Sequence, residues 1–143
     1  MMTRLFAALI LMSSGFAPAL RAQAPACPAP CAQNVPIFLA IYWKARPGKE
    51  LEYAEYIRRV AEPIDADAER AGAFEELRTY VPDQPNGEWT HLRVFRLKDQ
   101  AQFDAFSAAM DAAGKRVYPD PSKRPKSDEL RDLVKRETWR GFR

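Results

Sequence analysis

The residues best suited to chemistry lie in two short segments around the chain's one histidine, His91. An imidazole titrates near neutral pH and can accept or donate a proton. Arg78 and Arg93 could bind a carboxylate, phenolate or phosphate through paired N–H donors. Tyr80 and Trp89 could supply the apolar wall that a small-molecule pocket requires. These residue types indicate binding of an aromatic or anionic molecule, with proton transfer at His91 as the chemistry.

These side chains are expected to share one face of a β-hairpin. Residues 74–81 and 89–97 alternate with a period of two, and the Pro- and Asn-Gly-containing stretch between them is typical of a hairpin loop. Alternation puts six residues on one face: Glu76, Arg78, Tyr80, Trp89, His91 and Arg93. We expect a register with Glu76 opposite Arg93 and Arg78 opposite His91. The other face is expected under helices and contains Leu77, Thr79, Val81, Thr90, Leu92 and Val94.

A strand and a helix are expected before the hairpin. Residues 37–45 are rich in aromatic and branched side chains and predict a mostly buried strand, with Tyr42 beside the hairpin's polar face. Apolar residues from Leu51 to Ala71 recur at three- and four-residue spacing, which predicts an amphipathic helix with Asp65 outside. Pro63 should kink or restart this helix.

A second helix is expected after the hairpin, capped by Asp99 and ended by Gly114. An extra loop and short helix are predicted within 115–136, followed by a strand over 137–142. The order strand, helix, strand, strand, helix, strand is that of a ferredoxin-like α+β sandwich, with an antiparallel sheet and helices on one face. The other face must then be paired or exposed to solvent.

Three segments resemble the dimeric α+β barrel superfamily, which includes small domains like the antibiotic-biosynthesis monooxygenases. They are Ile37 to Lys49, Ala71 to Phe74 and Trp89 to Phe106. The resemblance implies a homodimer in which two sheets face each other, with a pocket between each sheet and its own loops and helices. It implies no catalytic residues for this chain, because no set from a particular enzyme maps onto it.

The chain is expected to contain one domain behind a cleaved leader. Residues 1–22 have a positive start, an apolar stretch too short to span a bilayer and small residues near Ala22, which predicts a signal peptide and an exported, periplasmic or extracellular protein. Cleavage could follow Ala22 or Ala24. Residues 23–36 read as a Pro- and Ala-rich linker and 37–143 as the domain. Cys27 and Cys31 could pair locally if the chain turns, or across a dimer, and Cys27 could instead carry a lipid.

Charge and motifs exclude several function classes. The net charge is +3, of which Arg4 and Arg21 in the leader contribute +2, residues 33–113 contribute −4 and residues 114–143 contribute +5. The basic end could bind an anionic partner or could complement the acidic body, but no nucleic-acid module or stable membrane anchor accompanies it. A lone histidine lacks the partners that a metal site needs, and no nucleotide or hydrolase motif is present, so we expect no metal and no cofactor.

Three interpretations of the polar hairpin face follow from the sequence. It could be a ligand site without chemistry, or the site of a cofactor-independent oxygenation or isomerisation with His91 as proton shuttle. It could also be the contact surface of a non-catalytic, exported homodimeric interaction module, held by Glu76 with Arg93 and by stacked aromatic rings.

Overall fold

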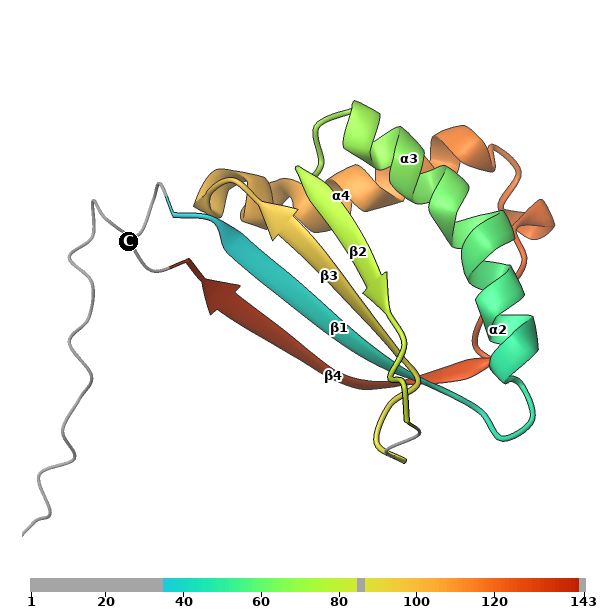
Figure 1. Cartoon of the computed structure of the whole chain (residues 1–143). Helices are drawn as coiled ribbons and strands as arrows, with labels where there is room; N and C mark the ends of the chain where they lie inside the picture. The colour runs from blue at the N-terminus through green and yellow to red at the C-terminus, as the bar shows by residue number, and fades with distance from the viewer. Residues whose placement is uncertain (1–34, 85–86, 142–143) are drawn as a thin grey trace, which may run out of the picture.

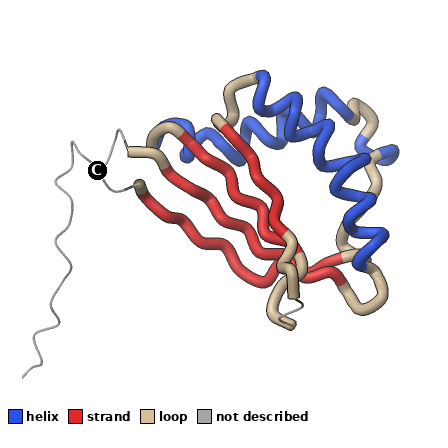
Figure 2. Tube along the Cα trace, viewed as in Figure 1, coloured by secondary structure: helices blue, strands red, loops and turns tan. Residues whose placement is uncertain are grey.

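The computed structural model describes residues 35–84 and 87–141, which form one antiparallel sheet with helices on one side (Figure 1). The sheet has the strand order β2-β3-β1-β4. Its strands are β1 (Ile37–Ala45), β2 (Glu76–Tyr80), β3 (His91–Leu97) and β4 (Arg131–Arg140). The helices are α2 (Glu50–Tyr56), η1 (Ile57–Ala61), α3 (Glu62–Arg70), α4 (Gln100–Val117) and the short η2 (Pro121–Lys123). Figure 2 shows that the opposite face, which we call the open face, is covered by none of the described helices. The predicted ferredoxin-like α+β architecture is therefore confirmed.

The core lies between the sheet and helices α3 and α4. Ile37 on β1 and Leu97 on β3 are directly opposite each other and fully buried under the helices. The ring of Phe95 packs against that of Phe106 on α4, with centroids 4.9 Å apart. Asp99 caps α4 as predicted, because its carboxylate accepts from the Gln102 amide at 2.8 Å. These contacts fix the sheet under the helices and so determine which strand residues can reach solvent.

The first helical segment contains one turn of π-helix, η1, between α2 and α3. Pro63 is the second residue of α3 and has no N–H to donate to the preceding turn, which explains why regular α-helical bonding is interrupted there. A one-residue insertion of this kind rotates the residues before it by about 100° relative to those after it. The predicted inward position of Leu51 is therefore wrong: it is 86% exposed, and Tyr53 is fully buried instead.

The hairpin register differs from the predicted one. Each β2 residue therefore shares a face with the β3 residues that were expected on the opposite face. Arg78 lies opposite Val94, and Thr79 lies opposite Arg93. Thr90 has no register partner in β2, and its amide donates to the Trp43 carbonyl of β1 at 2.9 Å. The expected pairs of Glu76 with Arg93 and of Arg78 with His91 are thus wrong.

The segment after α4 also differs from the prediction. No helix forms within 127–134, and α4 continues past Gly114 to Val117. Instead β4 begins at Arg131, six residues earlier than expected, and pairs along β1 with a bulge opposite Tyr42 and Trp43. A short, highly charged helix is only marginally stable by itself. Pairing with β1 instead satisfies the backbone groups of this segment within the sheet. The predicted leader and linker lie outside the described residues, except for residues 35 and 36.

Candidate functional site

The structure divides the seven predicted site residues among three places. His91 and Trp89 line a pocket at one end of the sheet. Glu76, Arg78 and Tyr80 line a second pocket on the open face. Arg93 is buried under the helices, which is the third place. Tyr42 does not line either pocket, and its ring packs edge-on against Trp89 at a centroid distance of 5.8 Å. The single constellation expected from the sequence is therefore not formed.

The sheet-end pocket has a volume of about 550 Å³ and lies where the loop after β1 meets the loop before β3. Its walls combine apolar, aromatic and ionisable groups: Lys44, Ala45, Pro47, Glu50, Val81, Pro82, Gly87, Trp89, Thr90 and His91. The ammonium of Lys44 donates to the Gly87 carbonyl and has two further N–H donors. This volume and composition are typical of sites for small organic molecules.

His91 forms the inner side of the sheet-end pocket and is only 6% exposed. Its Nδ1 lies 3.0 Å from the Thr90 hydroxyl, and its ring packs edge-on against Tyr53 at 4.7 Å between centroids. Burial lowers the pKa of His91, and the positive charge of Arg131 lowers it further. Nε2 has no hydrogen-bond partner among the described residues, yet it is not one of their fully enclosed polar atoms. At neutral pH the imidazole is therefore uncharged, with one nitrogen available to a ligand.

Arg131 and Tyr53 support this histidine, and sequence reasoning did not identify either of them. The guanidinium of Arg131 lies 3.5 Å from the ring centroid of Trp43 and donates to the Tyr53 hydroxyl at 2.8 Å. The hydroxyl is fully buried with the rest of its side chain, so this bond satisfies it. The only sequence signal for Tyr53 was an aromatic residue in the first turn of the helix, where Leu51 was the expected inward residue. The inward position of Tyr53 depends on the π-helical turn.

The stability of the protein should depend on the charge of its single histidine. Because the folded-state pKa of His91 lies below the unfolded value of about 6.5, the unfolded chain binds the proton more tightly. This contribution to stability is complete above that pH and is lost as the pH falls through the folded-state pKa. Urea unfolding between pH 7.5 and 5 should show a greater loss of stability for the parent than for His91→Gln. Equal losses would contradict a buried, neutral imidazole.

Arg93 forms a buried ion pair with Asp65 of α3, whose predicted outward position is wrong. The two side chains are 9% and 8% exposed. Burial raises the pKa of Asp65, while the Arg93 charge opposes that rise. Arg93 Nε is a fully buried donor that has no hydrogen-bond partner among residues 35–84 and 87–141. The pair joins α3 to β3 beneath the helices, and Arg93 does not line any of the pockets described here.

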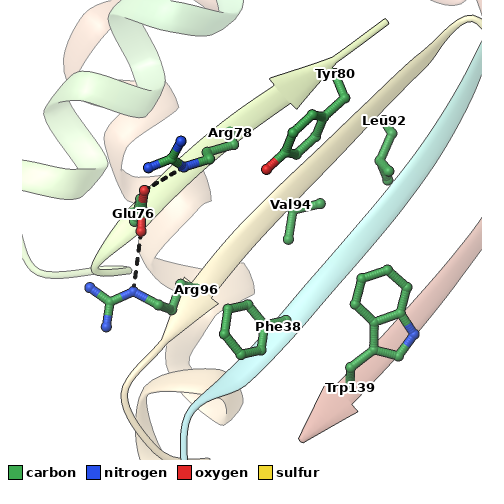
Figure 3. A pocket seen from close by; sticks show the side chains of 8 residues that line it. All are labelled: Phe38, Glu76, Arg78, Tyr80, Leu92, Val94, Arg96 and Trp139. Atoms are coloured by element: carbon green, nitrogen blue, oxygen red, sulfur yellow. Dashed lines mark hydrogen bonds and ion pairs between the residues drawn. The ribbon is translucent and has the colours of Figure 1, made fainter. Parts of the chain in front are cut away.

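The open face carries its own shallow pocket of about 430 Å³ (Figure 3). Three ionised side chains line it: Glu76, Arg78 and Arg96. The Glu76 carboxylate accepts from Arg78 Nε at 2.6 Å and lies 3.4 Å from Arg96 Nε. These contacts lower the pKa of Glu76, with the Arg78 hydrogen bond as the largest cause. The rest of the lining is mainly apolar: Phe38, Tyr80, Leu92, Val94 and Trp139. Tyr80 and Trp139 are 46% and 45% exposed, so this face presents aromatic area to solvent.

The described ranges contain neither a cluster of metal ligands nor a membrane-spanning helix. No group of three or more His, Cys, Asp or Glu side chains in residues 35–84 and 87–141 is arranged to hold a metal ion. Over the same residues, no helix combines the length and apolar character needed to cross a bilayer.

Comparison with known proteins identifies the fold and no closer relationship. No family model matches the chain, and no curated protein sequence matches it. Among solved structures, HapK from Hahella chejuensis is similar at a TM-score of 0.53 and 10% identity, over 74% of this chain and 92% of that one. A dimeric protein of unknown function and ferredoxin-like fold from Bacteroides fragilis has a TM-score of 0.50 and 13% identity, covering 76% and 98%. An ethyl tert-butyl ether d (EthD) family protein from Bacillus halodurans has a TM-score of 0.47 and 11% identity, covering 76% and 99%.

The likeness to the first two structures supports the predicted ferredoxin-like fold. One of them is itself described as dimeric. At these identities the likeness carries no substrate or catalytic residue to this chain.

Proposed function

We propose that this chain, whose fold is ferredoxin-like, binds a small aromatic molecule in the sheet-end pocket. The observation that carries the proposal is a pocket of about 550 Å³ against His91, whose Nε2 is free of protein partners in the described residues. Trp89 and Val81 supply apolar wall, and Lys44 supplies donors for a polar or anionic substituent. Glu50 lines the same pocket and limits the number of negative charges that the ligand can carry.

In its enzymatic form, the proposal assigns proton transfer to His91. A neutral imidazole accepts a proton from an acidic O–H or C–H of the bound molecule, and Lys44 stabilises the resulting oxyanion. The reaction would be a cofactor-independent isomerisation, or an oxygenation in which molecular oxygen is the oxidant and supplies the added oxygen. Arg78 and Arg93, to which the sequence assigned the oxyanion, do not line this pocket, so Lys44 takes that role.

The proposal also includes a homodimer formed through the open face. Tyr80 and Trp139 are exposed there in one copy, the neighbouring Phe38, Leu92 and Val94 are half-buried, and a second sheet would cover them all. The same observation favours the alternative function, a homodimeric interaction module without a ligand. We further propose that the protein is exported, on the evidence of residues 1–22.

A thermal-shift screen separates the ligand site from the interaction module. The mature chain is heated with a panel of small aromatic acids and phenols, including 4-hydroxybenzoate. A ligand at 100 times its Kd stabilises the folded state by about 2.7 kcal/mol and should raise Tm by several degrees.

The matched variants of the screen place a carboxylate inside or outside the pocket. Val81→Glu should abolish the shift, because Val81 lines the pocket. Val134→Glu should retain it, because Val134 is another exposed valine outside the pocket. A panel without any stabilising member, or an undiminished shift in Val81→Glu, would count against the ligand site.

A further inference from the structure

The Thr90 hydroxyl lies at the centre of three polar contacts next to His91. It accepts from the Ala45 amide at 2.8 Å and lies 3.3 Å from the Trp43 carbonyl. Its third neighbour is Nδ1 of His91, at 3.0 Å. Ala45 and Trp43 belong to β1, so the hydroxyl is held by the central strand and cannot turn away without losing both contacts.

The contacts of this hydroxyl determine which ring nitrogen carries the proton. A hydroxyl has one proton and two lone pairs. If Nδ1 is protonated, the ring donates to Thr90, the hydroxyl donates to Trp43, and all three contacts are hydrogen bonds. If Nε2 is protonated instead, the hydroxyl proton must go to Nδ1, and the Trp43 contact becomes two oxygens without a proton between them. The first arrangement makes one more hydrogen bond.

We infer that Thr90 is a positioning residue that holds His91 in the Nδ1–H form, so that Nε2 meets the pocket as a hydrogen-bond acceptor. This inference rests on the proposed function for its ligand but not for its geometry. An acceptor at that point selects molecules that present a donor to it, such as a phenol or an enol, over the corresponding ethers. The ligand class is therefore an aromatic molecule with a free hydroxyl group.

The tautomer can be measured directly, because the untagged chain contains one histidine and gives one set of imidazole signals. Two-bond 1H–15N correlation spectra above about pH 7, where the ring is neutral, distinguish a protonated from an unprotonated ring nitrogen. The parent and Thr90→Ser should show a protonated Nδ1 and a bare Nε2. Thr90→Val removes the acceptor, keeps the side-chain shape and should move protonation toward Nε2.

Two results would overturn the inference: a protonated Nε2 in the parent, or an unchanged Nδ1–H form in Thr90→Val. If Thr90→Val fails to fold, the parent and Thr90→Ser spectra still decide the tautomer. The ligand class is tested separately by the binding of 4-hydroxybenzoate and its methyl ether, 4-methoxybenzoate. The phenol should bind the parent about 5- to 10-fold more tightly, the effect of one hydrogen bond.

The two arms fail in different ways. Equal binding of phenol and ether contradicts the ligand class, even if the spectra show a protonated Nδ1. If neither compound nor any member of the panel binds, the proposed function fails, whereas a protonated Nδ1 that depends on Thr90 still supports the positioning role.

Discussion

Replacing Arg93 with methionine should lower the free energy of unfolding by about 3–5 kcal/mol, the usual effect of removing one partner of a buried ion pair. Asp65 would be left beneath the helices without a counter-charge, and its pKa, already raised by burial, would rise further. Much of the fold's total stability would be lost, since domains of this size are stable by about 5–15 kcal/mol. Equilibrium urea unfolding at pH 7 measures the effect.

Two controls test the cause of this loss. Arg78→Met removes a similar guanidinium from the same sheet, but its ion pair with Glu76 is largely solvent-exposed, so we expect a loss below about 1 kcal/mol. The double variant Asp65→Leu/Arg93→Met removes both buried charges and should recover most of the stability. Similar losses in Arg93→Met and Arg78→Met would contradict the buried position of the Arg93 side chain.

Replacing Val94 with aspartate should separate the proposed homodimer into monomers. Val94 lies on β3 between Ala40 of β1 and Arg78 of β2, near the middle of the open face. A carboxylate buried there in both copies should weaken association by about 2–4 kcal/mol, or roughly 30- to 1000-fold in Kd. Sedimentation velocity over a range of concentrations should show a dimer for the parent and a monomer for Val94→Asp.

Ser107→Asp is the matched control for this variant. It adds the same charge on the exposed surface of α4, on the side of the sheet away from the open face, and should leave the dimer intact. A parent that is monomeric at every concentration, or a Val94→Asp variant that associates as tightly as the parent, would refute the proposed interface.

The elements of the fold could be predicted where local chemistry decides them. The strand over Ile37–Ala45 was predicted to the residue, because a continuous aromatic and branched run ends at a Pro-Gly turn. Asp99 marked the start of α4 through its side chain. The strand-helix order then gave the ferredoxin-like topology.

The face of the hairpin could not be predicted, because β3 is ambiguous in its own sequence. One side carries Leu92 and Val94 with an arginine, and the other carries Phe95 and Leu97 with His91 and Arg93. The larger apolar side is the buried one, and its ionisable groups are tolerated only because of Asp65 and Thr90, which come from elsewhere in the chain. Local alternation contains no information about such distant partners.

The sheet-end pocket could be predicted only in part for the same reason. His91 and Trp89 were identified from their residue types, and the structure places both at one cavity. Lys44 and Tyr53 were missed because their contributions depend on loop closure and on the π-helical turn rather than on spacing. Arg131 was missed because its segment was expected to be a loop and helix, whereas it begins an edge strand.

The most direct test of the central claim, a small-molecule site against His91, is to follow the imidazole NMR signals during titration with the panel compound that raises Tm most. We expect the single histidine's ring signals to shift saturably, with a Kd equal to that from calorimetry, and to stay unchanged in Val81→Glu over the same titration. Binding measured by calorimetry without any change in the His91 signals would contradict the claim.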